Sequence, residues 1–76
     1  MSARTFRVII EPDENDTFHA FVPTLPGCHT WGNSLAETKK NIKEAIELYV
    51  RDLIECGEQV PEENSFDTFE TIALPV

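Results

Sequence analysis

Hydrophobic and polar side chains alternate in two short stretches near the start of the chain. The first is residues 5–11 (TFRVIIE) and the second is residues 17–22 (TFHAFV), and both are rich in β-branched and aromatic residues. This period of two predicts two β-strands. Residues 11–16 (EPDEND) separate the strands and contain Pro, Asn and Asp, which favour tight reversals. The two strands are therefore predicted to be antiparallel.

Hydrophobic residues recur at helical spacing in a longer stretch that follows Ser34. Ser34 and Glu37 fit a capping box, in which the serine hydroxyl accepts a backbone hydrogen bond and the glutamate side chain reaches back. The helix is predicted to begin at Leu35 and to end near Cys56, where Gly57 suits a left-handed cap. Its hydrophobic stripe comprises Leu35, Ile42, Ala45, Ile46, Tyr49, Val50 and Leu53.

Two more extended segments complete the predicted fold. His29–Gly32, between a Leu-Pro-Gly turn and the helix cap, predicts a third strand, and residues 68–74 (TFETIAL) predict a fourth. The chain is thus predicted to be a single α+β domain over residues 1–76, with β-β-β-α-β order and a four-stranded mixed sheet. A right-handed crossover through the helix places the fourth strand beside the first and parallel to the third. The predicted strand order is third, second, first, fourth.

One helix can cover only one face of such a sheet. Phe6, Val8 and Ile10 are predicted to face the helix, which leaves Ile9, Phe21 and Trp31 on the other face. An exposed hydrophobic patch of this kind indicates a surface for a partner or for a second copy of the chain. A homodimer or a higher homo-oligomer is therefore expected.

The charge balance indicates the kind of partner. The chain has 76 residues and a formal net charge of -8, from 14 acidic and 6 basic residues. This charge disfavours direct binding to nucleic acid or to an anionic membrane and favours a basic protein partner. Asp13, Glu14 and Asp16 are the predicted contact residues, because they are the densest acids in an exposed turn. The sequence has no hydrophobic run typical of a signal peptide or membrane span, so a cytoplasmic location is expected.

The stretch from Pro26 to Gly32 concentrates residues that can carry chemistry. Pro26 and Gly27 are predicted to form a turn, and Gly32 to let the chain leave the strand. Neighbouring strand residues point to opposite faces, so Cys28 and His29 cannot readily share a metal ion. Cys28 is predicted to be a small buried residue with a free thiol, and His29 to lie at the solvent edge. No metal and no cofactor are predicted.

An enzymatic function is disfavoured by the distribution of the acidic residues. They lie in the first turn, on the outer face of the helix and in the loop after it, so they do not converge as the carboxylates of a two-metal nuclease do. A nucleophilic cysteine would need an electropositive setting, which a chain this acidic does not offer. The protein is predicted not to be an enzyme.

The order of the motifs resembles the HicB-like antitoxin family. The resemblance covers residues 6–61 and rests on the Glu-Pro-Asp-Glu turn, Leu-Pro-Gly-Cys, Gly-Asn-Ser-Leu and Asn-Ile-Lys-Glu-Ala-Ile. It implies a partial ribonuclease-H-like fold and an antitoxin that binds and blocks HicA-type toxins, which are small, basic and RNA-cleaving. By this resemblance Pro26, Gly27 and Gly32 correspond to scaffold positions of the family. Cys28, Ser34 and Glu37 are also predicted to be structural, from the sequence itself.

Two functional interpretations remain after this resemblance. Many members of the family continue into a C-terminal DNA-binding domain, whereas this sequence stops at Val76, so nucleic acid binding by this chain alone is not expected. The alternative to an antitoxin is a stand-alone oligomeric interaction or small-ligand-binding module of the same fold. A neighbouring reading frame for a basic protein of roughly 60–90 residues would favour the antitoxin.

Overall fold

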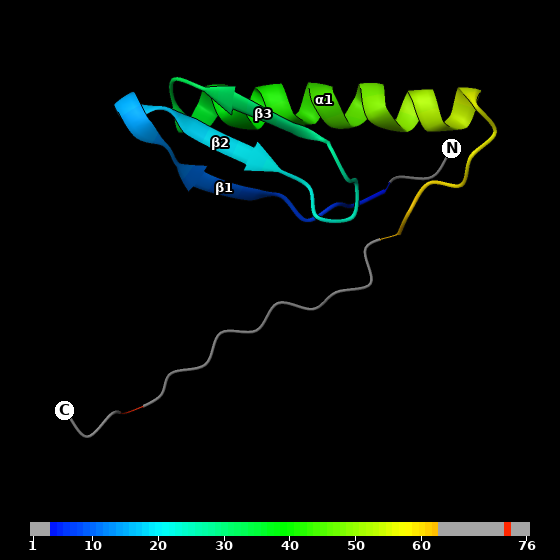
Figure 1. Cartoon of the computed structure of the whole chain (residues 1–76), viewed down its shortest axis with the longest axis horizontal. Coiled ribbons are helices and arrows are strands. Elements are labelled where there is room, and N and C mark those ends of the chain that lie inside the picture. Colours follow the sequence, from blue (N-terminus) through cyan, green and yellow to red (C-terminus); the bar gives the residue numbers. More distant parts are fainter. Residues whose placement is uncertain (1–3, 63–72, 74–76) are drawn as a thin grey trace.

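The computed structural model describes residues 4–62 and residue 73, which form a three-stranded antiparallel sheet and one long helix. The strands are β1 (Ile9–Pro12), β2 (Phe18–Phe21) and β3 (His29–Gly32), and the helix is α1 (Leu35–Glu55). A short 3-10 turn, η1 (Glu14–Asp16), joins β1 to β2. The sheet order is β1-β2-β3, and α1 runs along one face of the sheet (Figure 1). The predicted α+β class is confirmed.

The first strand is shorter than the alternating pattern predicted. Pairing begins at Ile9, which lies opposite Phe21 of β2, so residues 5–8 have the pattern of a strand but stand outside the ladder. The reason lies in the partner strand, because Pro23 has no N–H to donate and the chain turns away after Val22. Strand length in this sheet therefore depends on the partner as well as on the local sequence.

The helix begins and ends where its capping residues predicted. The N–H of Glu37 donates to the Ser34 hydroxyl at 3.0 Å, which caps the first turn. At the other end Gly57 has a φ of 72° and donates to the carbonyl of Ile54, while Glu58 donates to that of Leu53. These two bonds form a Schellman motif, which satisfies carbonyls that the helix end would otherwise leave open.

The core lies between α1 and the sheet. Its most buried side chains come from β2, from the loop after it and from the helix, and partly buried residues of the N-terminal segment and of α1 pack around them. Full burial of one aliphatic side chain stabilises the fold by about 1.5–3 kcal/mol. The buried residues are Ala20, Val22, Leu25, Cys28 and Ile42, and the surrounding ones are Phe6, Val8, Ile10, Ala45, Ile46, Tyr49 and Val50.

The predicted fourth strand, residues 68–74, lies outside the described residues except for Ala73, which is exposed. The order of the other three strands agrees with the predicted one. Within residues 4–62 and 73, no helix is both long enough and apolar enough to cross a membrane.

Candidate partner-binding surface

The face of the sheet that points away from α1 carries the hydrophobic residues predicted for a partner. Successive side chains of a strand point to opposite faces, and Ala20 of β2 is completely buried in the core. Its neighbours therefore point away from the helix. The register extends this open face across the three strands in two rows, Ile9 with Phe21 and His29, and Glu11 with His19 and Trp31. The structure thus brings Ile9, Phe21 and Trp31 onto one surface.

Four aromatic rings on the open face form one contiguous cluster. The centroid of the His19 ring lies 5.2 Å from that of Trp31, 5.7 Å from that of Phe21 and 5.8 Å from that of His29. The rings of His29 and Trp31 are 5.1 Å apart and perpendicular. Aromatic rings at such separations attract each other. We call His19, Phe21, His29 and Trp31 the ring cluster.

Backbone geometry explains why these rings meet. The N–H of Val22 donates to the carbonyl of Cys28 at 3.1 Å, and such bonds recur at every second pair of an antiparallel ladder. Both cross-strand pairs of the ring cluster are therefore non-hydrogen-bonded pairs, in which side chains approach most closely. The carbonyl of Trp31 does not bond to β2. It accepts a hydrogen bond from the side-chain amide of Asn41 on α1 at 2.8 Å. This bond fixes β3 beneath the helix.

Trp31 is a large and exposed member of the ring cluster. The indole side chain is the largest in the chain, yet 52% of Trp31 is exposed. A large aromatic residue contributes strongly to an interface when a partner covers it. His19 and His29 were not predicted as binding residues, although they share the strand positions of Phe21 and Trp31. Following the alternation across all three strands would have identified them.

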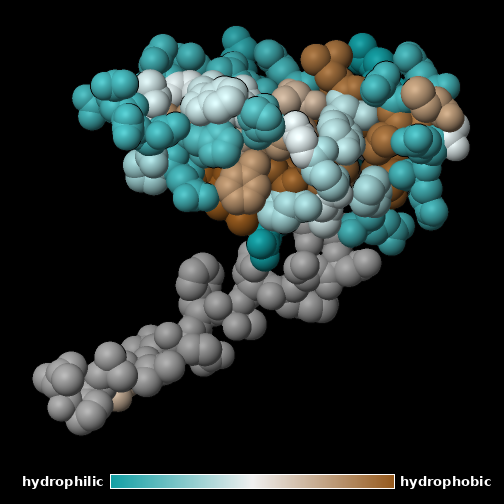
Figure 2. Space-filling view, in the orientation of Figure 1, coloured by the Kyte–Doolittle hydropathy of each residue, from teal (hydrophilic) through white to brown (hydrophobic). Residues whose placement is uncertain are grey.

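The predicted acidic contact residues lie at one end of this face. Asp13, Glu14 and Asp16 are exposed in the turn between β1 and β2, and we call them the acidic turn. A carboxylate oxygen of Asp13 accepts from the N–H of Glu14 at 2.8 Å, and the Thr17 hydroxyl donates to the Glu14 carbonyl at 2.8 Å. Asn15 and Asp16 adopt left-handed conformations, with φ of 62° and 59°. Figure 2 shows hydrophilic side chains gathered at the end of the molecule that carries this turn.

The Pro-Gly turn before β3 is a scaffold element. Gly27 has a φ of 84° and follows Pro26, and the N–H of Cys28 donates to the Leu25 carbonyl at 3.0 Å. A type II turn favours proline and glycine at these two central positions. The Tyr49 hydroxyl of α1 donates to the carbonyl of Pro26 at 2.9 Å and so ties the turn to the helix.

Cys28 and His29 lie on opposite sides of the sheet. Cys28 is buried in the core, where desolvation raises the pKa of its thiol above the usual value, and a raised pKa disfavours the nucleophilic thiolate. His29 is exposed on the open face. Residues 4–62 and 73 contain no group of three or more His, Cys, Asp or Glu residues that could hold a metal ion.

Gly32 allows the helix to approach the sheet. A Cβ at this position would lie 2.7 Å from the backbone nitrogen of Thr38 and 2.9 Å from its Cα, closer than atoms can pack. Thr38 is itself completely buried, and its hydroxyl donates to the Ser34 carbonyl at 2.7 Å. The close approach, in addition to the path of the chain toward Ser34, explains why glycine is needed here.

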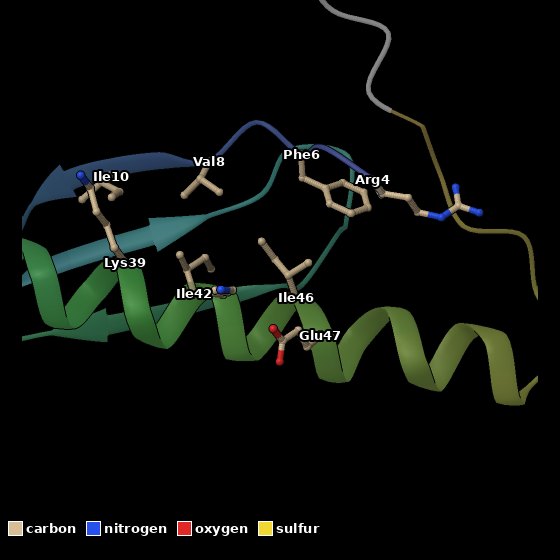
Figure 3. Close-up of a pocket in the computed structure, with 9 residues that line it drawn as sticks. Arg4, Phe6, Val8, Ile10, Lys39, Ile42, Ile46 and Glu47 are labelled. Atoms are coloured by element: carbon tan, nitrogen blue, oxygen red, sulfur yellow. The ribbon is translucent and has the colours of Figure 1, made fainter. Parts of the chain in front are cut away.

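A second surface feature lies on the helix side of the sheet. The groove has a volume of about 510 Å³ and separates the N-terminal segment and β1 from α1. Figure 3 shows hydrophobic side chains pointing into it from both sides, with charged side chains at its margin. The lining residues are Arg4, Phe6, Val8, Ile10, Lys39, Ile42, Lys43, Ile46 and Glu47. Three of the six basic residues of the chain thus gather on the side opposite the ring cluster.

The structure defines a small α+β domain with one sheet face covered by α1 and an open face that carries aromatic rings. A sequence model described as the HicB-like antitoxin of bacterial toxin-antitoxin systems matches residues 6–73. The chain belongs to this family. Membership implies a toxin-antitoxin role and a toxin partner, and the family and fold suggest a non-enzymatic protein.

Individual relatives agree with this assignment. The chain is similar to the N-terminal domain of the antitoxin HicB of Burkholderia pseudomallei, with 36% identity and a TM-score of 0.72, over 80% of this chain and 72% of that one. It is 42% identical to a UPF0150 protein of Synechocystis over 78% of this chain and 75% of the relative. A UPF0150 protein of Archaeoglobus fulgidus is 49% identical over 70% of this chain and 80% of its own.

Proposed function

We propose that this chain is an antitoxin that binds a basic, RNA-cleaving toxin of the HicA type and blocks it by covering its RNA-binding surface. The observation that carries this proposal is the likeness to the N-terminal domain of HicB, which combines sequence identity with a shared fold. The charge supports it, because a chain of net charge -8 is attracted to the cationic surface that an RNA-binding toxin must present.

The contact surface in this proposal has two parts. The acidic turn steers the encounter, since exposed charges act mainly on the association rate. Ile9, Phe21 and Trp31 of the open face supply hydrophobic contacts, which act mainly on the dissociation rate. The chain is expected to act in the cytoplasm, where an RNA-cleaving toxin meets its substrate.

Co-expression with the protein encoded beside this chain tests the proposal. Induction of the neighbour alone should stop growth, and induction of both proteins should restore it. Gly32→Ala disturbs the packing of α1 on the sheet and serves as the control. This variant should neutralise the toxin less well, which would show that neutralisation needs the folded chain. A neighbour that is harmless, or that remains toxic beside soluble and folded antitoxin, would contradict the proposal.

The alternative is a stand-alone module that associates with itself through the open face. The half-exposed Trp31 and its neighbouring rings are the observation that favours it. Sedimentation of the purified chain at micromolar concentration tests the alternative, because a strictly monomeric species would contradict it. A dimer is compatible with both functions, and the toxicity of the neighbouring protein then decides between them.

A further inference from the structure

The open face combines two chemical features that occur together in single-stranded RNA. RNA presents flat aromatic bases beside a line of negative phosphates, and proteins that grip it use stacking contacts together with lysine and arginine. In the ring cluster, the centroids of neighbouring rings lie 5.1–5.8 Å apart, on a surface that a partner can reach. The acidic turn lies at the end of the same surface.

The register shows how close the two features are. Glu11 lies in the same cross-strand row as His19 and Trp31, so one carboxylate already belongs to the open face. The acidic turn begins two residues after Glu11 along the chain, which is roughly 7 Å at about 3.3 Å per residue. Carboxylates thus lie beside the ring cluster, in the row of Glu11 and in the turn that follows β1.

Most basic residues lie away from the carboxylates of this surface, and Lys40 and Arg51 are on α1. Arg4, Lys39 and Lys43 line the groove on the helix side. Arg7 precedes Ile9 by two positions, so the alternation places it on the side of the open face, but toward the end of the sheet away from the acidic turn. A cationic partner that approaches the turn end therefore meets carboxylates and aromatic rings together.

We propose that the open face imitates RNA, with the ring cluster in the place of bases and Glu11 and the acidic turn in the place of phosphates. The toxin would engage it with the same arginine and lysine side chains that hold its RNA. Trp31 is the central contact, because a guanidinium or ammonium group is attracted to the face of an indole ring. This inference rests on the proposed function, since it requires a toxin that binds RNA.

A displacement experiment tests the imitation directly. The probe is a fluorescein-labelled, nuclease-resistant 2′-O-methyl RNA of about 16 nucleotides bound to the purified neighbour-encoded protein. Wild-type chain should displace it, as seen by a fall in fluorescence anisotropy. Trp31→Ala should need at least about tenfold more chain for half displacement, whereas Trp31→Phe, which keeps a ring, should recover most of the effect.

The matched control is Leu48→Ala. Leu48 is also a large and exposed hydrophobic residue, 63% accessible, but it lies on α1 rather than on the open face. Its substitution should leave displacement unchanged. Circular dichroism on each variant confirms that the chain is folded before displacement is compared.

Each outcome separates this inference from the proposed function. Equal displacement by Trp31→Ala and wild type, or a ternary complex in which the RNA stays bound, would overturn the imitation while leaving the antitoxin role intact. Loss of a wild-type dimer in Trp31→Ala would assign the open face to a second copy and also overturn it. Absence of any binding between wild-type chain and neighbour would contradict the proposed function itself.

Discussion

The two faces of the sheet differ in a way that reverses the usual expectation for a small domain. The face covered by α1 carries small residues at its centre, since Ala20 is completely buried and Gly32 has no side chain. The open face carries the larger rings, and Trp31 is half exposed. Small residues let the helix approach closely, so packing against α1, rather than side-chain size, decides which face becomes the core.

This difference has a functional consequence. Large residues are placed on the covered face of a stable domain when they serve the core, and on an open face when another molecule covers them. The buried core lies on the covered face and Trp31 of the open face is half exposed, so we expect the covered face to supply most of the stability of the isolated domain. Substitutions on the two faces should therefore separate folding from binding.

The largest expected contrast is between Ile42→Ala and Trp31→Ala. Ile42 is 3% exposed, and its truncation leaves a cavity in the core, so the free energy of unfolding should fall by about 3 kcal/mol. Trp31→Ala removes a larger side chain but a half-exposed one, and should cost below about 1 kcal/mol. Urea denaturation of both variants measures the contrast. A large and concentration-dependent loss in Trp31→Ala would show that a second copy covers the open face.

A smaller contrast is expected between two glycines. Gly32→Ala places a Cβ against the backbone of Thr38 and should destabilise the fold by about 2 kcal/mol, because backbone atoms cannot move aside as a flexible side chain can. Gly27→Ala meets no atom within 4 Å and only strains a φ of 84°, so about 1 kcal/mol is expected. Thermal unfolding of both variants ranks them, and the reverse order would refute the close approach of helix and sheet.

The sequence predicted the helix more accurately than the strands. Both ends of α1 are set by local chemistry, by the Ser34 hydroxyl at the start and by Gly57 at the end, and local chemistry can be recognised in a pattern. The length of β1 is limited by Pro23, which follows the partner strand β2, and alternation within residues 5–11 cannot show this. The fourth strand stays a prediction, since its residues lie outside the described part of the chain.

The candidate surface was predicted only in part for a similar reason. Ile9, Phe21 and Trp31 were recognised as hydrophobic residues on the uncovered face. The sequence predicts His29 only as a residue at the solvent edge and assigns no role to His19, because polar rings carry no hydrophobic signal. Their contribution depends on the cross-strand register, which brings them to 5.2 and 5.1 Å from the Trp31 ring.

A pH effect of intermediate size should distinguish the two cysteines. Burial raises the pKa of the Cys28 thiol above the ordinary cysteine value of 9.0, so the thiol ionises first in the unfolded chain as the pH rises. Below pH 9.0 the thiol is protonated in both states, so the free energy of unfolding keeps its full value. Above this pH the free energy of unfolding falls, by up to about 1.4 kcal/mol per pH unit. Unfolding by urea between pH 7 and pH 10 should show this fall in wild type and in a variant of the exposed Cys56, Cys56→Ala, but not in Cys28→Ala. An unchanged slope in Cys28→Ala would contradict the assignment.

Substitutions in the acidic turn should have the smallest effect on stability. Their effect is expected on the kinetics of binding. Asp13→Asn, Glu14→Gln and Asp16→Asn together remove three negative charges from exposed positions, and asparagine at residue 13 keeps an oxygen that can accept from the Glu14 N–H. The free energy of unfolding should change by no more than about 0.5 kcal/mol. Association with the toxin at low salt should slow by roughly threefold to tenfold and lose much of its salt dependence, while dissociation stays the same.

The matched control for this prediction removes the same charge elsewhere. Glu44→Gln, Asp52→Asn and Glu55→Gln are exposed positions on α1 and change the net charge by the same amount, so they report the effect of overall charge alone. Surface plasmon resonance at several salt concentrations compares the two triple variants. If both variants associate equally slowly, the net charge of the whole chain steers the encounter and the position of the acidic turn does not matter. Slower association of the turn variant alone would show a local contribution of the turn.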